Sequence, residues 1–470
     1  MWLLDGDFGC VVPCRWFFAF RFRSRVCLFL LATWVMLMSA ASSQPPALKT
    51  KERATTRREL STKNQEPGRQ EPFRPKPDEF APLERAHRYR GELVFVDRAN
   101  RRGSLRIDGA GRFRFAGPSP FALLPYAVVR YHGAPADLRD IPLGTVLHVW
   151  AFLPPEPRIS SVPVLPANNR TKKLGYAGTG TAPAENHVLL MEDEVSYCRR
   201  TKQTWRLKEI DVSNNQGSIV AARLPRESSQ GQSIAEDVTM TFDAATRIWR
   251  GREFLNVQDL IDEGIWPASG KKIANGQAVQ LGIVWKPTPS GVFTRFHISD
   301  IWLDEPAMLR AARRQTETHR TFIRSRWIPA RVDRLEYGEF GSAKVTATLF
   351  GGMDKSLYAD FRKERTVMVA PSENTLKHWA SGSAGTVQMA SKGPIVDVTR
   401  IKGEIPLGSS GVQIQMETDL VTEGIRPGRV VRIRPASWPN LEVPREEYLH
   451  DARDTLEERF PSPDIFPLYR

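Results

Sequence analysis

Short segments of alternating polar and apolar residues recur along much of the chain, as expected for half-buried β-strands. In residues 89–153, five such segments lie between turns rich in Gly, Pro and Asn: 89–96, 104–107, 112–115, 126–131 and 145–152. Five short strands this close together predict a small β-barrel. Residues 201–287 and 328–434 repeat the pattern, so we predict two further barrel units.

A nine-residue pattern relates these units. Windows 259–267 and 419–427 share Asp, Leu, Glu, Gly, Ile and Pro in register, and a Gly-led strand follows each. Residues 137–149 carry a similar Asp-Leu and Gly. We expect the Leu to pack against its barrel and the Gly to start the closing strand at a tight corner. The predicted fold is mainly β, with two or three small OB-like or SH3-like barrels in series and two helices.

Two segments have helical spacing. Asp304 and Pro306 form a start signal before an apolar stripe that extends to residue 327, and Gln315 and His319 make the middle of this stripe polar. A second helix is predicted near residues 444–460. The other face of the first helix carries five arginines: Arg310, Arg313, Arg314, Arg320 and Arg324. Two interpretations stay open: a polyanion- or lipid-headgroup-binding surface, and the solvated face of a helix packed on the barrels.

The first 41 residues have the layout of a secretory signal peptide. Four arginines precede a largely apolar run, 26–38, and small residues follow it. This run is shorter than the roughly 20 residues of a bilayer span. We therefore expect cleavage after Ala41 and a secreted or periplasmic protein. The alternative is an uncleaved leader, which would be the chain's only contact with the membrane.

Linkers and tails complete the predicted organisation. Residues 42–88 are interpreted as a Pro-rich disordered linker, because they are charged and poor in large apolar side chains. Residues 154–200 are assigned as a second linker, 288–327 as a strand plus the first helix, and 435–470 as the C-terminal helix and tail. The barrel units then span 89–153, 201–287 and 328–434.

Charge and cysteine content narrow the functional classes. The net charge is +14, from 67 Lys and Arg against 53 Asp and Glu, but half of the excess lies in residues 1–90. The remainder is mildly basic with mixed signs, so no nucleic-acid partner is expected. Three cysteines, Cys10, Cys14 and Cys27, belong to the predicted leader. Cys198 alone remains, which excludes an internal disulfide and a Cys-rich zinc module in the mature chain.

The sequence contains no local catalytic signature. The eight histidines lie at no zinc-ligand spacing, no Gly-x-Ser-x-Gly occurs, and residues 264–272 miss the P-loop spacing, so no metal site or cofactor is predicted. Glu192, Asp193 and Glu194, near His187, are interpreted as a solvated turn. Dispersed catalytic carboxylates need no local motif and stay open. The nine tryptophans beyond the leader are expected to pack in the barrels rather than stack on sugars.

The order of strand, Gly turn, strand, Asp-Leu and closing strand resembles small OB-like barrels in secreted bacterial proteins of unknown function. The long Arg-rich leader and low cysteine content are similar to those of exported hypothetical proteins of planctomycete-type bacteria. This resemblance implies export and assigns no catalytic residues.

Three functions stay open from the sequence. The leading hypothesis is a non-catalytic binding or scaffold protein of the cell envelope, with envelope polymers or proteins as partners. The second is a carbohydrate-active enzyme with dispersed carboxylates in a Trp-lined cleft. The third is an anionic-glycan binder that uses the five arginines of the first helix.

Overall fold

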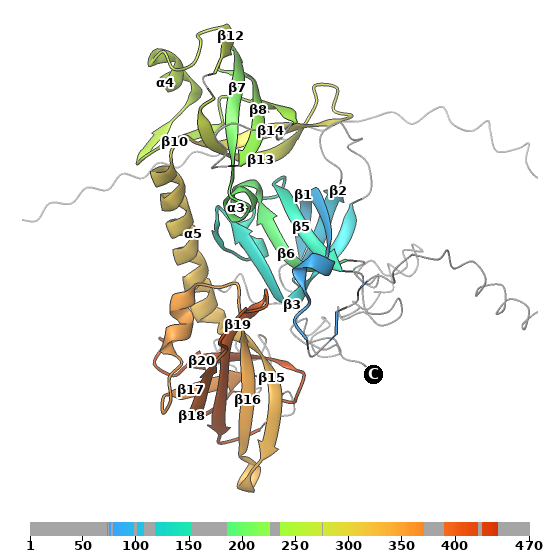
Figure 1. The fold of residues 1–470 in the computed structure, drawn as a ribbon, viewed down its shortest axis with the longest axis vertical. Coiled ribbons are helices and arrows are strands. Elements are labelled where there is room, and N and C mark those ends of the chain that lie inside the picture. The colour runs from blue at the N-terminus through green and yellow to red at the C-terminus, as the bar shows by residue number, and fades with distance from the viewer. Residues whose placement is uncertain are drawn as a thin grey trace, which may run out of the picture. The chain divides into compact units, whose positions relative to one another are not determined.

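The computed structural model describes residues 73, 75–76, 79–97, 101–107, 118–152, 186–225, 236–274, 276–370, 390–421 and 425–439. The predicted leader, the strand predicted at 112–115 and the helix predicted near 444–460 lie outside these residues, as does most of the 42–88 linker. The described part of the chain is mainly β and contains three closed barrels (Figure 1). The predicted fold class is therefore confirmed, with three barrels rather than two.

Barrel 1 closes through the pairing order β1, β2, β3, β6, β5 and back to β1. Its strands are β1 (His87–Asp97), β2 (Arg102–Ile107), β3 (Ser119–Tyr131), β4 (Ala134–Pro135), β5 (Val146–Phe152) and β6 (Asn186–Asp193). Strands β3 and β6 are parallel, and the other closing pairs are antiparallel. This order of the five long strands, with the third and fifth parallel, is that of the OB fold.

Barrel 2 repeats the same order with β7, β8, β9, β14 and β13. Its strands are β7 (Gln203–Ser213), β8 (Gln216–Pro225), β9 (Asp237–Phe242), β13 (Ala278–Pro287) and β14 (Thr294–Trp302), with β9 and β14 parallel. Between β9 and β13 lie β10 (Arg247–Arg250), β11 (Glu253–Leu255), α4 (Val257–Asp262) and β12 (Gly270–Ile273). Because β14 pairs with β9 and β13 within this barrel, the predicted boundary at residue 287 is wrong.

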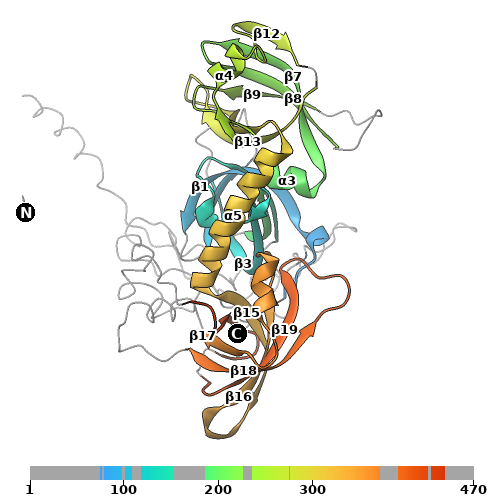
Figure 2. The same ribbon diagram turned by 90° about the vertical axis from the view of Figure 1, so that its left-hand side faces the viewer.

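Barrel 3 is closed but has a different strand order. It runs β15, β16, β19, β18, β17, β20 and back to β15, and every pair is antiparallel (Figure 2). The strands are β15 (Ile328–Tyr337), β16 (Ala343–Phe350), β17 (Thr366–Ala370), β18 (Ser391–Arg400), β19 (Ser409–Thr418) and β20 (Val430–Pro435). It is therefore not a third copy of the OB topology.

All three barrels nevertheless share one backbone arrangement in the first strand. A β-bulge follows the buried residues Leu93, Leu207 and Val332. Their N–H groups donate to the carbonyls of Thr145, Gln277 and Arg429 at 3.0, 3.0 and 2.9 Å. The preceding glycines, Gly144, Gly276 and Gly428, have φ of 91°, 66° and 79°, where a Cβ would be strained. The prediction of a Gly corner before each closing strand is confirmed.

The Asp-Leu part of the pattern behaves less uniformly. Leu138, in the 3-10 helix Leu138–Asp140, and Leu260 of α4 are buried as predicted. Leu420 of barrel 3 is 46% exposed, so the expectation that it packs against its barrel is wrong.

Helix α5 (Glu305–Arg326) connects β14 of barrel 2 to β15 of barrel 3 and contacts β4, β10 and β14. Asp304 caps its first turn by accepting a hydrogen bond from Ala307 N at 2.8 Å. The polar middle of its stripe is matched by barrel 1, because the Gln315 amide donates to Asp140 at 3.0 Å. This confirms the predicted helix packed on the barrels.

Short helical segments occupy several connections. They are α3 (Glu194–Arg200) and the 3-10 helices Leu83–Arg85, Leu138–Asp140, Glu339–Gly341 and Lys355–Asp360. None of the helices among the described residues is both long enough and apolar enough to cross a bilayer.

The tryptophans belong to the interior. Of the eight in the described ranges, seven are buried: Trp150, Trp205, Trp266, Trp285, Trp302, Trp327 and Trp438. Trp249 is half-buried. Packing of these rings in and between the barrels is confirmed. Trp285 and Trp302 also form part of the walls of two small surface pockets, of about 260 and 180 Å³.

Candidate functional site

The segment Glu192–Asp193–Glu194 lies at the junction of barrels 1 and 2, where β6 runs directly into α3. The three residues are 0, 3 and 1% exposed, so the interpretation of this segment as a solvated turn is wrong. The prediction that residues 154–200 form a linker is wrong for residues 186–200. In this segment β6 pairs with both β3 and β5, and α3 covers the outside of barrel 1.

Asp193 forms the N-cap of α3. Its carboxylate accepts hydrogen bonds from Ser196 N at 2.9 Å and from His132 N at 3.0 Å. Burial outweighs these bonds and raises the pKa of Asp193 to about 7. The side chain thus joins α3 to the turn between β3 and β4.

Glu194 accepts hydrogen bonds from both barrels. His148 Nε2 lies at 2.7 Å and Cys198 Sγ at 3.3 Å, while Trp205 Nε1 lies at 3.0 Å and an Arg223 guanidinium nitrogen at 2.7 Å. Burial alone would raise the pKa of Glu194, but His148, Arg223 and Cys198 together lower it to about 2. The carboxylate is therefore ionised, and all of its neighbours donate to it.

Glu192 completes the acidic segment. Arg200 Nε lies 2.8 Å from its carboxylate and Arg130 Nε lies 4.0 Å away. A backbone bridge between Thr145 and Val284 joins the same two barrels nearby. The acidic segment therefore fastens barrel 1 to barrel 2, and its carboxylates are not available to a substrate.

Cys198 is equally unavailable. It is buried, and burial together with the nearby Glu194 charge raises the pKa of its thiol well above the ordinary value. A reactive cysteine needs the opposite environment.

Arginines and aromatic rings stack beside the acidic segment. The guanidinium carbons of Arg88, Arg223 and Arg200 lie 4.7, 5.2 and 5.8 Å from the centroid of the Tyr197 ring. Arg88 and Arg200 also lie over Trp150, at 5.4 and 4.6 Å. Arg90 lies 4.9 Å from the centroid of the Phe296 ring. We call Arg88, Arg90, Arg200 and Arg223, with the rings of Tyr197, Trp150 and Phe296, the arginine stack.

The strand register explains part of this stack. On the outer face of barrel 1, Arg88 is paired with Trp150 and Arg90 with His148 of β5. Strand β5 is buried on both faces, because barrel 1 fills the inside and α3 and barrel 2 cover the outside. Its largely apolar sequence, interrupted only by His148, was the sequence signal for this covered face.

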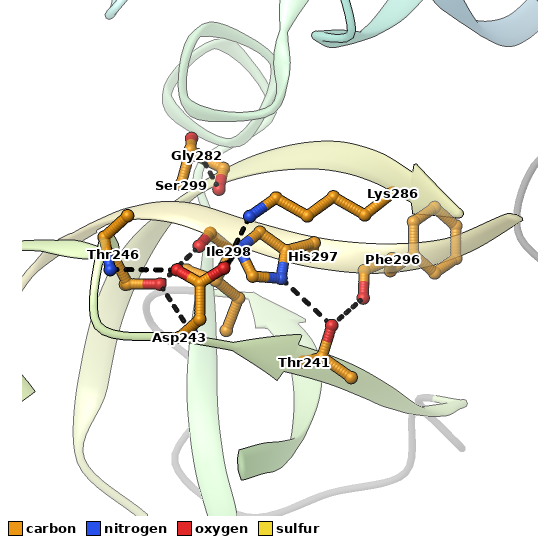
Figure 3. Close-up of polar contacts among 10 residues, drawn as sticks. Thr241, Asp243, Thr246, Gly282, Lys286, Phe296, His297, Ile298 and Ser299 are labelled. Carbon is orange, nitrogen blue, oxygen red and sulfur yellow. Dashed lines mark hydrogen bonds and ion pairs between the residues drawn. The ribbon is translucent and has the colours of Figure 1, made fainter. Parts of the chain in front are cut away.

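A second polar cluster joins three strands of barrel 2 (Figure 3). Lys286 Nζ lies 2.6 Å from Asp243 Oδ2, His297 Nε2 lies 3.5 Å from the same oxygen, and His297 Nδ1 lies 3.0 Å from Thr241 Oγ1. Burial, then the Lys286 charge, lower the pKa of His297 to about 4, so the ring is neutral at pH 7. The Thr241 hydroxyl donates to the Phe296 carbonyl at 3.2 Å. This bond uses the hydroxyl proton within the barrel, so the cluster joins strands and is not a nucleophile with its base.

The five arginines predicted on α5 do not form one open surface. Arg320 Nε donates to Asp354 at 2.7 Å, and Arg324 is half-buried with its guanidinium 5.8 Å from the Trp438 ring centroid. Arg310 is also half-buried, while Arg313 and Arg314 are exposed. Polyanion binding by this helix stays a prediction that rests mainly on the two exposed residues.

A groove of about 620 Å³ lies at the end of barrel 3 where β15 turns into β16. We call it the hairpin groove. It is lined by Glu336, Tyr337, Gly338, Ser342, Ala343, Lys344, Thr366, Lys392, Gly393, Pro394, Glu417, Thr418 and Asp419. Of these residues, Tyr337 is 74% exposed. Phe340, at the tip of the same hairpin, does not line the groove and is fully exposed. Sequence reasoning missed these residues because two aromatics near a turn resemble ordinary strand ends.

Within the described ranges, no three His, Cys, Asp or Glu side chains come together as metal ligands. No family model, no curated protein and no solved structure matches the chain.

Proposed function

We propose that this chain is a non-catalytic binding protein of the cell envelope that holds an oligosaccharide at the hairpin groove of barrel 3. The observation that carries the proposal is the conformation of Phe340, which is fully exposed and has φ of 55° and ψ of 32°. Exposing a Phe side chain forgoes about 2 kcal/mol of burial. A left-handed backbone at a non-glycine residue costs about 1 kcal/mol more. These costs are offset when the ring contacts a ligand.

The residues that line the groove favour a sugar over an apolar ligand. Glu336 pairs with Lys344 across the strands, and Lys344 pairs with Glu417, so charges of alternating sign cross the groove. Such a surface offers many hydrogen-bonding groups with little net charge. A sugar ring matches both features, since its C–H face stacks on aromatics and its hydroxyls bond to charged side chains.

The hairpin is held in place rather than free. Gly338 N donates to Ser342 O at 2.9 Å, and Val421 N donates to Gly341 O at 3.0 Å. The second bond joins the tip to the segment that follows β19. A site on a fixed hairpin loses less conformational entropy when a ligand binds.

A non-catalytic role is supported by where the carboxylates and tryptophans lie. Glu192 and Glu194 are buried in ion pairs, and seven tryptophans are buried, so these side chains are poorly placed to form the Trp-lined cleft with facing carboxylates that the enzyme hypothesis needs. The envelope location rests on the leader-like residues 1–41.

The test is calorimetric titration with neutral cello-, chito- and laminari-hexasaccharides. Phe340→Ala and Tyr337→Ala should each weaken binding about tenfold, because each removes one stacking ring. Phe254→Ala, which removes a 57% exposed ring from barrel 2, is the matched control and should change affinity less than twofold. Absence of binding to all three sugars, or equal losses in the control, overturns the proposal. Shorter sugar products after incubation would favour the carbohydrate-active enzyme instead.

A further inference from the structure

We propose a second binding site, separate from the hairpin groove, at which the arginine stack holds phosphate or sulfate groups of an anionic polymer. It lies at the junction of barrels 1 and 2 and uses Arg88, Arg90 and Arg200. It does not depend on the sugar-binding proposal.

Charge is not balanced at this junction. Arg223 is paired with Glu194, and Arg200 and Arg130 share Glu192. For the other two arginines of the stack, the contacts within the described ranges are with rings: Arg88 with Trp150 and Tyr197, and Arg90 with Phe296 at 4.9 Å. The junction therefore carries two guanidinium charges beyond its ion pairs.

Charges of both signs act on Arg90. Burial is the main cause that lowers its pKa; Glu194 opposes this, the Arg223 and Arg88 charges lower the pKa further, and Glu236 raises it. An anion placed beside Arg88 and Arg90 would relieve this repulsion. Such relief is a driving force that a balanced surface cannot supply.

The guanidinium groups are fixed before any ligand arrives. Each guanidinium carbon lies over an aromatic ring, 4.6–5.4 Å from its centroid, and this contact restricts the side chain. Arg88 and Arg200 are exposed and Arg90 is half-buried, so all three are within reach of solvent. Arg88 and Arg90 alternate on β1, which sets their Cα atoms about 7 Å apart. That spacing suits successive anionic groups of a polymer better than one small ion.

The rings themselves favour a polymer recognised by its charges over a nucleic acid recognised by its bases. Trp150 is 8% and Tyr197 6% exposed, and the rings are occupied by guanidinium groups and by His148, which stacks on Tyr197 at 4.0 Å. Bases need open ring faces for stacking. These rings position the arginines and leave no stacking platform.

The test measures binding of fluorescent inorganic polyphosphate and of heparin by anisotropy over a range of salt concentrations. Arg88→Gln with Arg90→Gln should weaken binding of both roughly tenfold for each lost charge-assisted contact. The slope of log K against log salt should fall by about two, because two fewer counterions are released. Arg313→Gln with Arg314→Gln, which removes the same charge from α5, is the matched control and should change affinity less than threefold.

Each alternative gives a distinct result. Equal losses in the two double variants would mean a general attraction to the basic surface and overturn the site; a loss confined to the α5 variant would move binding to that helix. Tighter binding of a single-stranded oligonucleotide than of polyphosphate with the same number of phosphates would also overturn it. Arg88→Glu changes a single exposed residue, so it can be tested even if the double variant does not fold. It should lose binding as strongly as the double variant. Phe340→Ala should bind polyphosphate normally, which separates this site from the sugar site.

Discussion

Replacing Glu194 by Gln tests the acidic segment most directly. The substitution keeps the shape of the side chain and removes the charge that Arg223 and Trp205 approach at 2.7 and 3.0 Å. It also places an NH₂ group among groups that all donate. The Arg223 guanidinium would then remain at the barrel junction without its carboxylate.

The expected loss can be worked out in two ways. The pKa of Glu194 is lowered from its ordinary 4.5 to about 2, which corresponds to about 3 kcal/mol of stabilisation at pH 7. Breaking a buried ion pair by removing one partner costs about 3–5 kcal/mol. Because the folded-state pKa lies below the unfolded value, this contribution is complete above about pH 4.5 and is lost as the pH falls through 2.

The assay is urea denaturation of wild type and Glu194→Gln at pH 7, 4 and 3. We expect a free energy of unfolding lower by about 3 kcal/mol at pH 7, and a difference that shrinks towards pH 3. Glu209→Gln removes a partly exposed partner of Lys271 in barrel 2 and should cost less than about 1 kcal/mol. A variant within 1 kcal/mol of wild type at pH 7, or a pH-independent difference, would refute the reasoning.

Three further outcomes follow from the described geometry and from the predicted leader. Asp193 has a folded-state pKa raised to about 7, so its own contribution to stability grows as the pH falls from 7 towards 4. Asp193→Asn should lack this contribution, and its free energy of unfolding relative to wild type should therefore fall from pH 7 towards pH 4 in denaturation curves. Cys198 should resist maleimide labelling in the native protein and react fully in urea, as followed by mass spectrometry; rapid native labelling would contradict its burial. N-terminal sequencing of protein from its host should begin near Ser42, whereas a retained leader in the membrane fraction would favour the anchor.

Local patterns predicted the parts of this fold that depend on local chemistry. The alternating strands, the Gly corners at Gly144, Gly276 and Gly428, and the start of α5 at Asp304 each arise from a few neighbouring residues. Their stereochemical requirements are the same wherever they occur, which is why the sequence reveals them.

The junction of barrels 1 and 2 could not be predicted in this way. Glu194 takes its partners from positions 148, 198, 205 and 223, which lie on four different elements. Taken alone, a run of three acidic residues favours solvent. The hydrogen-bond donors that offset the cost of burying these carboxylates come from distant parts of the sequence. The prediction of a solvated turn failed because these long-range contacts override the local preference for solvent.

The direct passage from β6 into α3 and then into β7 decides how the protein can be dissected. Only two residues separate α3 from β7, and the β6 residues Val188, Leu189, Leu190 and Met191 are fully buried. A fragment ended at residue 185, where the sequence suggests a linker, would lose the fifth strand of its barrel and leave the edges of β3 and β5 unpaired. Such edges pair with other chains, so this fragment would aggregate. A portion that contains barrel 1 should therefore extend through β6 and α3 into barrel 2, so that the two OB barrels are expressed together.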